Sequence, residues 1–109
     1  MILSALLALT LAEPSLEQAQ ACRAHMELFI EEVARENEHV AGPTWFISSW
    51  WTQKAIEAGA PDDDGATLKA LKSNLEQMRT ETPENFAAGR QACVDTAIDG
   101  GAVPGMGPA

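Results

Sequence analysis

Apolar residues recur along this chain at three- and four-residue steps, in four stretches separated by glycine and proline residues. This spacing places an apolar stripe along one side of an α-helix. No stretch shows the alternating, β-branched pattern of a half-buried strand. The sequence therefore predicts an all-α fold, a small up-down bundle of about four helices. The expected helices cover residues 15–40, 44–58, 66–80 and 84–98.

The two cysteines, Cys22 and Cys93, fall in the first and last of these helices. In an up-down bundle these two helices are antiparallel neighbours, and both cysteines then lie ~8–9 Å from the same end of the bundle. We therefore expect a disulfide between them, which would restrict the unfolded chain by about 4 kcal/mol. Two reduced, buried thiols are the alternative, and a cytosolic location would imply them.

Residues 1–12 are mostly apolar and uncharged, and Glu13-Pro14 ends the run. A short apolar segment ending in small residues is typical of a secretory signal peptide. As a helix it would extend about 18 Å, less than the ~30 Å core of a bilayer, so we expect no transmembrane span. We expect cleavage after Ala12 and a periplasmic or secreted bacterial protein. Because no basic residue precedes the apolar run, a buried first segment of a cytosolic protein is the alternative.

The rest of the chain divides into a helical domain at 13–99 and a tail at 100–109. The tail is rich in glycine and proline. Such a composition buries too little apolar surface to offset the entropy of ordering, so we expect the tail to be disordered.

Acidic residues outnumber basic residues by 16 to 7, which gives a formal net charge of −9. Nucleic acids and anionic membrane surfaces attract proteins through cationic faces, so this charge argues against both as partners. We expect instead a protein partner with a basic or apolar surface.

The second expected helix carries an unusual concentration of aromatic residues, Trp45, Phe46, Trp50 and Trp51. Helix geometry separates Trp50 from Trp51 by about 100° and Trp45 from Trp50 by about 140°. The three indoles therefore cannot all point into one core, and we expect at least one to be partly exposed. An exposed indole is either a tolerated surface residue or an anchor for a partner. The candidate anchors are Trp45, Trp50 and Trp51.

Two histidines and two glutamates fall within about 60° of one line along the first expected helix: His25, Glu32, Glu36 and His39. Glu36 and His39 have the carboxylate–imidazole spacing of di-metal helical bundles. No other expected helix offers a histidine to complete such a site. We therefore expect a solvated acidic stripe with no bound cofactor, whose histidines titrate near neutrality. A surface metal site at these four residues is the weak alternative.

Three aspartates, Asp62 to Asp64, and Gly65 precede the third expected helix. An EF-hand loop with its glycine at Gly65 would need acidic residues at positions 60 and 71, which hold Ala60 and Leu71. We expect the aspartates to cap the helix N-terminus, where the unpaired amides and the helix dipole favour negative charge.

Motifs of common enzymes are missing from the sequence, among them a glycine-rich phosphate loop, a Gly-x-Ser-x-Gly elbow and a His-Glu-x-x-His pair. Cys22 and His25 have the spacing of a nucleophile and its base, but a disulfide would consume the thiol. We therefore expect no catalytic residues and no enzymatic activity.

An exported, acidic, all-helical chain with one long-range disulfide is similar in outline to small periplasmic acid-stress chaperones, a likeness of architecture alone. We expect a non-catalytic binding module, such as an inhibitor, an immunity-type protein or an envelope accessory protein. The alternatives are an acid-stress chaperone and a metal-binding helix using His25, Glu36 and His39.

Overall fold

The computed structural model describes residues 13–106 and contains four α-helices. They are α2 (Leu16–Arg35), α3 (Gly42–Glu57), α4 (Gly65–Glu81) and α5 (Pro83–Asp99). The predicted all-α fold of four helices is confirmed, and no strand occurs in the described residues. The expected signal peptide at 1–12 and the tail residues 107–109 lie outside the described residues.

Helix α2 begins as predicted, with the Ser15 hydroxyl accepting a hydrogen bond from the Gln18 amide at 3.0 Å. It ends at Arg35 rather than at residue 40. Asn37 has a φ of 59°, a left-handed conformation that asparagine tolerates and that stops the helix. Pro43 lies in the first turn of α3, where its fixed φ is favourable. The Gly42-Pro43 pair therefore marks the start of α3 and not the end of α2.

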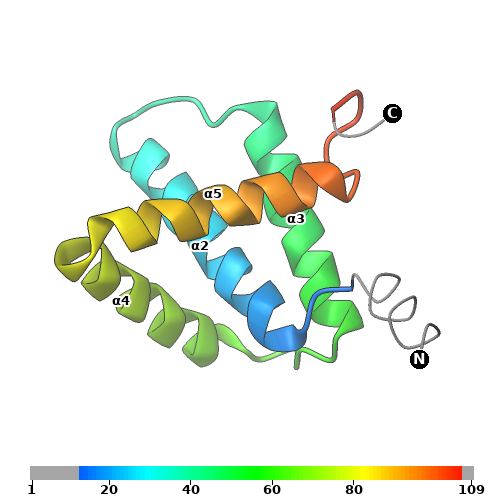
Figure 1. The fold of residues 1–109 in the computed structure, drawn as a ribbon, viewed down its shortest axis with the longest axis horizontal. Helices are drawn as coiled ribbons and strands as arrows, with labels where there is room; N and C mark the ends of the chain where they lie inside the picture. Colours follow the sequence, from blue (N-terminus) through cyan, green and yellow to red (C-terminus); the bar gives the residue numbers. More distant parts are fainter. Residues whose placement is uncertain (1–12, 107–109) are drawn as a thin grey trace, which may run out of the picture.

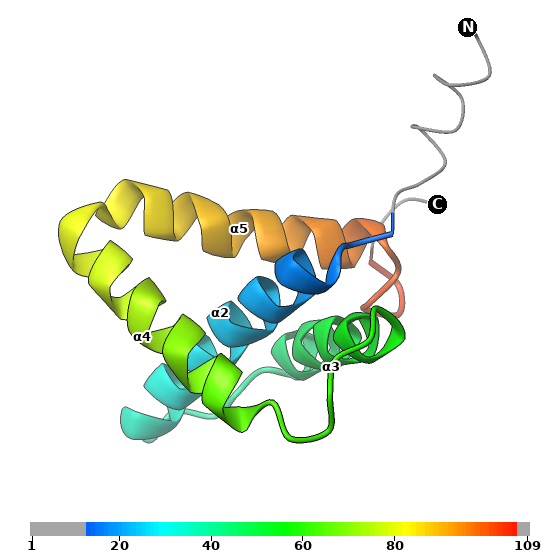
Figure 2. The same cartoon turned by 90° about the horizontal axis from the view of Figure 1, so that it is seen from below.

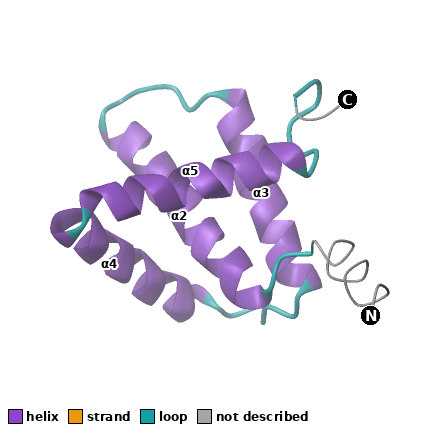
Figure 3. Ribbon diagram, in the orientation of Figure 1, coloured by secondary structure: helices purple, strands orange, loops and turns teal. Residues whose placement is uncertain are grey.

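Helix α2 lies at the centre of the molecule and packs against the other three helices. Helices α2 and α3 run antiparallel side by side, and α5 crosses both of them in a second layer (Figures 1 and 2). Helix α4 packs against α2 and α5 and has no contact with α3 within the described chain. Loops join α2 to α3 and α3 to α4, whereas Thr82 alone separates α4 from α5 (Figure 3).

Buried apolar residues form two separate clusters. The first, here called the disulfide cluster, joins α2, α3, α5 and the segment after α5, and contains Ala19, Cys22, Met26, Ile47, Trp51, Ala55, Cys93, Ala97 and Val103. The second, the α4 cluster, joins α2, α4 and the start of α5, and contains Ala24, Leu28, Leu68, Leu75 and Phe86. Helix α2 therefore buries two faces, whereas the sequence predicted a single apolar stripe.

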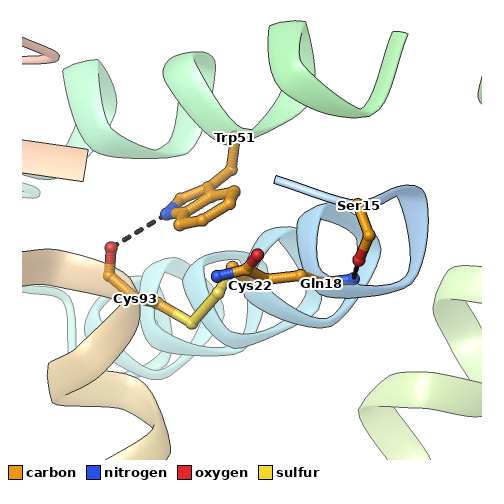
Figure 4. The surroundings of a disulfide bond; sticks show 5 residues. All are labelled: Ser15, Gln18, Cys22, Trp51 and Cys93. Atoms are coloured by element: carbon orange, nitrogen blue, oxygen red, sulfur yellow. Dashed lines mark hydrogen bonds between the residues drawn. A yellow bond between two sulfur atoms is a disulfide. The ribbon is translucent and has the colours of Figure 1, made fainter. Parts of the chain in front are cut away.

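The predicted Cys22–Cys93 disulfide is confirmed and links α2 to α5, with the two Cα atoms 5.4 Å apart. Trp51 of α3 lies against this bond and is wholly buried. Its indole N–H donates a hydrogen bond to the Cys93 carbonyl oxygen at 2.9 Å (Figure 4). Three helices are thus fastened at one place, by a covalent bond and by an indole that packs beside it.

The start of the expected disordered tail is packed against the helices. The Ala102 amide donates to the Ala97 carbonyl oxygen at 2.9 Å, and Gly101, with a φ of 89°, turns the chain back. Val103 is then only 5% exposed and belongs to the disulfide cluster. Glycine and proline content alone predicted disorder from residue 100 onward; Val103 packs against the helices, whereas residues 104–106 are exposed.

Candidate functional site

The three candidate tryptophans lie in different environments and do not form one site. Trp51 is buried beside the disulfide. Trp50 is half-buried and packs edge-on against Trp51, with the ring centroids 4.9 Å apart, and the Lys54 ammonium lies 5.1 Å from its ring. Trp45 is 52% exposed. The prediction that at least one indole is partly exposed is confirmed, and Trp45 is the indole most available to a partner.

Phe46, beside Trp45, is also exposed, at 49%. Helix α3 turns Ile47, Trp51 and Ala55 toward the core, and this four-residue spacing leaves positions 45 and 46 outside. Trp45 and Phe46, here called the aromatic end of α3, lie in the first turns of that helix. Phe46 is a candidate that the sequence argument did not name as an anchor, although it is adjacent to Trp45 on the same helix.

An open pocket of about 390 Å³ lies at the same end of α3, between the end of α2 and the loop that follows it. Its apolar side consists of Phe29 and Val33, and two carboxylates, Glu36 and Glu38, stand on the loop side. The full set of lining residues is Phe29, Val33, Glu36, Glu38, His39, Ala41 and Thr44. An apolar wall beside carboxylates suits a side chain with an aliphatic stem and a cationic head.

Most basic side chains are already paired. Within the described residues, which hold every charged side chain, ion pairs engage Arg23, Lys54, Lys72, Arg79 and Arg90. Glu36 and Glu38 form none within residues 13–106, and both are exposed. Arg35, at the end of α2, is exposed and is in none of these pairs either. The unpaired charges at this end of the described structure are therefore two carboxylates and one guanidinium, a net negative charge.

A second polar cluster lies where α2, α4 and α5 meet. The Glu32 carboxylate accepts hydrogen bonds from Arg79 of α4 and from Arg90 of α5, the latter at 3.0 Å. Both guanidiniums lie over the Phe86 ring, at 4.3 and 4.8 Å from its centroid. Burial opposes ionisation of Glu32, but the hydrogen bonds and charges of the two arginines outweigh it and lower the pKa of this carboxyl group.

His25 lies in the same cluster and is 5% exposed, so the expectation of a solvated histidine is wrong. Its ring packs 5.2 Å from the Phe86 ring, and it fits because Gly89 has no Cβ, which would lie 3.1 Å from Nε2. Its Nδ1 has no hydrogen-bond partner in the described residues. Burial above all, and then the charges of Arg90 and Arg79, lower the pKa of His25 to about 4.

The four residues of the weak metal alternative are not brought together. His25 is buried, Glu32 is bound to arginines, and Glu36 and His39 stand exposed beyond the end of α2. Because α2 ends at Arg35, the last two lack the helical spacing that the sequence suggested. No group of three His, Cys, Asp or Glu residues within 13–106 is arranged to hold a metal ion.

Asp64 precedes α4 as expected, but its carboxylate makes no capping bond within the described structure. It is buried and accepts hydrogen bonds from Gln20 Nε2 at 2.8 Å and from Arg23 Nη1 at 2.9 Å. The bond from Gln20, together with the charge of Arg23, lowers the pKa of Asp64. Asp64 therefore fastens the start of α4 to α2, while Asp62 and Asp63 are exposed.

Comparison with protein-family models, with curated proteins and with solved structures finds no match to this chain. The nucleophile pair suggested by Cys22 and His25 is not available, because Cys22 is in the disulfide. Among the described helices, none combines the length and the apolar character needed to cross a bilayer. The aromatic end of α3, with the acidic loop beside it, is the candidate site for a partner.

Proposed function

We propose that this chain is a small, exported, non-catalytic interaction protein that binds a partner through the aromatic end of α3. The observation that carries the proposal is the half exposure of Trp45 and Phe46 on adjacent positions of a rigid helix. Export is supported by the apolar leader and by the disulfide, because such bonds persist in oxidising compartments.

The partner should combine an apolar contact with positive charge. Burying the exposed part of a large aromatic side chain contributes roughly 1–3 kcal/mol, and tryptophan is over-represented among the residues that dominate binding. Glu36 and Glu38 flank this end without ion pairs among the described residues. Such rim charges mainly raise the association rate and select against acidic partners.

The test places a photo-crosslinking residue at one position of the chain in its native host. We expect the variant Phe46→p-benzoylphenylalanine to form one defined cross-linked species. Lys69, exposed on the distant helix α4, provides the control position. Equal cross-linking from positions 46 and 69 would contradict the proposal.

Calorimetry with the captured partner then measures what the aromatic end contributes. We expect Trp45→Ala to weaken binding about tenfold or more, since central tryptophans commonly contribute over ~1.4 kcal/mol. Ile56→Ala, an equally exposed apolar position at the other end of α3, should change the affinity less than about twofold. Similar losses in the two variants would show that α3 does not bind by its aromatic end.

A second candidate function, an acid-responsive chaperone, is favoured by a different observation, the burial of His25 without a partner for Nδ1 in the described residues. A protein of this kind exposes apolar surface to its clients when acid loosens its packing. Binding of a hydrophobic dye should rise between pH 7 and pH 3. A flat dye signal over this range removes the candidate.

A further inference from the structure

We propose that acid releases α4 from α2 while the disulfide cluster stays folded, so that one arm of the molecule opens in response to pH. The proposal goes beyond partner binding and does not depend on the aromatic end of α3. It stands on how α4 is held, on what surrounds His25, and on which groups the disulfide cluster contains.

Helix α4 is held on α2 by the apolar contacts of the α4 cluster and by ion pairs. Leu68 and Leu75 are the buried residues of this helix. Its polar contacts with α2 each involve a carboxylate, in the pairs Asp64–Arg23, Lys72–Glu27, Lys72–Glu31 and Arg79–Glu32. Protonation of a carboxylate leaves its Arg or Lys partner charged and without a counter-charge, so acid weakens the attachment at each of these pairs.

His25 adds a group that acts at higher pH. Its imidazole packs against Phe86 and Gly89 of α5. The charged groups that face it are Arg90 of α5 and Arg79 of α4, with Glu32 of its own helix bound between them. The charged groups of α3, Lys54 and Glu57, pair with each other elsewhere. A proton on His25 would place a third cation beside one carboxylate, with no acceptor for its Nδ1 among the described residues.

Phe86, which packs on His25, belongs to the α4 cluster, so opening of this cluster would give His25 access to water, where an imidazole protonates readily. The pKa of His25 is about 4 in the closed molecule, against an ordinary value of 6.5. Between these two pH values the open form binds a proton that the closed form does not, so opening becomes more favourable as the pH falls. The opening constant should rise by on the order of 300-fold in total, from a pH well above 6.5 to a pH well below 4, tenfold for each unit of the pKa difference.

The disulfide cluster has no comparable response. Its members are apolar residues, a tryptophan and the two cysteines of the disulfide, none of which titrates in this range. The disulfide and the Trp51 hydrogen bond to Cys93 hold α2, α3 and α5 together at that end. Helix α4 makes no contact with α3 in the described residues, so it can leave without disturbing this cluster.

The test is hydrogen exchange of the disulfide-bonded chain, followed by mass spectrometry at pH 7 and pH 4.5 and corrected for the intrinsic exchange rates. We expect the protection of amides in residues 68–77 to fall about 50-fold, in line with the pKa difference of His25. Amides of α3 between residues 47 and 54 should change less than about threefold. Loss of protection in both segments together, or in neither, would overturn the proposal.

Two variants separate His25 from the general effect of acid. His25→Gln cannot take up the proton, so α4 should keep its protection between pH 7 and pH 4.5 to within about twofold. His39→Gln, which changes the exposed histidine, should behave like the wild-type chain. If His25→Gln loses protection as the wild type does, the imidazole is not the trigger.

A measurement on the wild-type chain covers the case in which His25→Gln does not fold. The two histidine Cε1 protons are followed by NMR while the pH is lowered. We expect His25 to titrate well below its ordinary value of 6.5, with α4 amide signals that change at the same midpoint as His25. A His25 midpoint near 6.5, with α4 signals unchanged, overturns the proposal.

Discussion

Single side chains of this protein have roles that helical spacing indicates only in part. Angles between successive helix positions predicted that one of three indoles would be exposed, but not that it is Trp45. The angles also placed His25 and Glu32 on one side of the helix, and the charges of Arg79 and Arg90 act on both. The prediction that His25 is exposed was wrong because it assumed one buried face per helix. Ala24 and Leu28 form a second buried face of α2, on either side of His25 in the sequence.

Gly100 provides a test at this scale, because a Cβ there would lie 2.4 Å from Trp50 Cζ2. The indole is held between Trp51 and Lys54 and has to move. We expect Gly100→Ala to lower the free energy of unfolding by about 1–3 kcal/mol, the usual cost of overpacking, and to change the fluorescence of Trp50. Urea denaturation measures the first effect.

Gly42 is the matched control, since a Cβ at this position meets no atom within 4 Å among the described residues. Gly42→Ala should leave stability unchanged or raise it by up to about 1 kcal/mol, because alanine restricts the unfolded chain. Equal stability of the two alanine variants would show that Trp50 is not confined against Gly100.

At the scale of the helices, the sequence predicts the elements better than their contacts. Breaks at Gly42-Pro43, at Pro61 and at Pro83 placed the four helices, since these residues interrupt or begin a helix in a known way. The position of α4 was not predictable, because it depends on long-range pairs such as Asp64 with Gln20 and Arg23. Nothing in local spacing distinguishes such a buried aspartate from a helix cap.

Asp64→Asn tests that attachment. The hydrogen bonds to Asp64 are charge-assisted, so the variant should lose about 2 kcal/mol of stability at pH 7. The pKa of Asp64 is lowered from 3.8 on folding, so its contribution is present above that pH and is lost as the pH falls through the lower value. Urea denaturation at pH 7 and near pH 3 should show the difference between wild type and variant shrinking.

Asp62→Asn serves as the comparison, because Asp62 is exposed two positions earlier in the same run. It should match the wild type to within about 0.5 kcal/mol at both pH values. A difference between wild type and Asp64→Asn that grows on acidification would mean that Asp64 is not stabilised as a carboxylate.

At the scale of the whole molecule, the disulfide between Cys22 and Cys93 could be predicted. Both cysteines lie near one end of the expected bundle, so their sulfur atoms were expected to meet. The division into a disulfide cluster and an α4 cluster could not, because α5 crosses α2 and α3 instead of following them (Figure 1). Local patterns carry no information on such a crossing. Likewise, the packing of Val103 depends on where α5 ends in space.

We propose that the protein is exported and works with Cys22 and Cys93 joined. The most direct test is the intact mass of the protein isolated from its native host, recorded before and after reduction. We predict a chain that starts at Glu13 and gains the mass of two hydrogen atoms on reduction. A chain that still carries residues 1–12, with two free thiols before any reductant is added, would contradict the account.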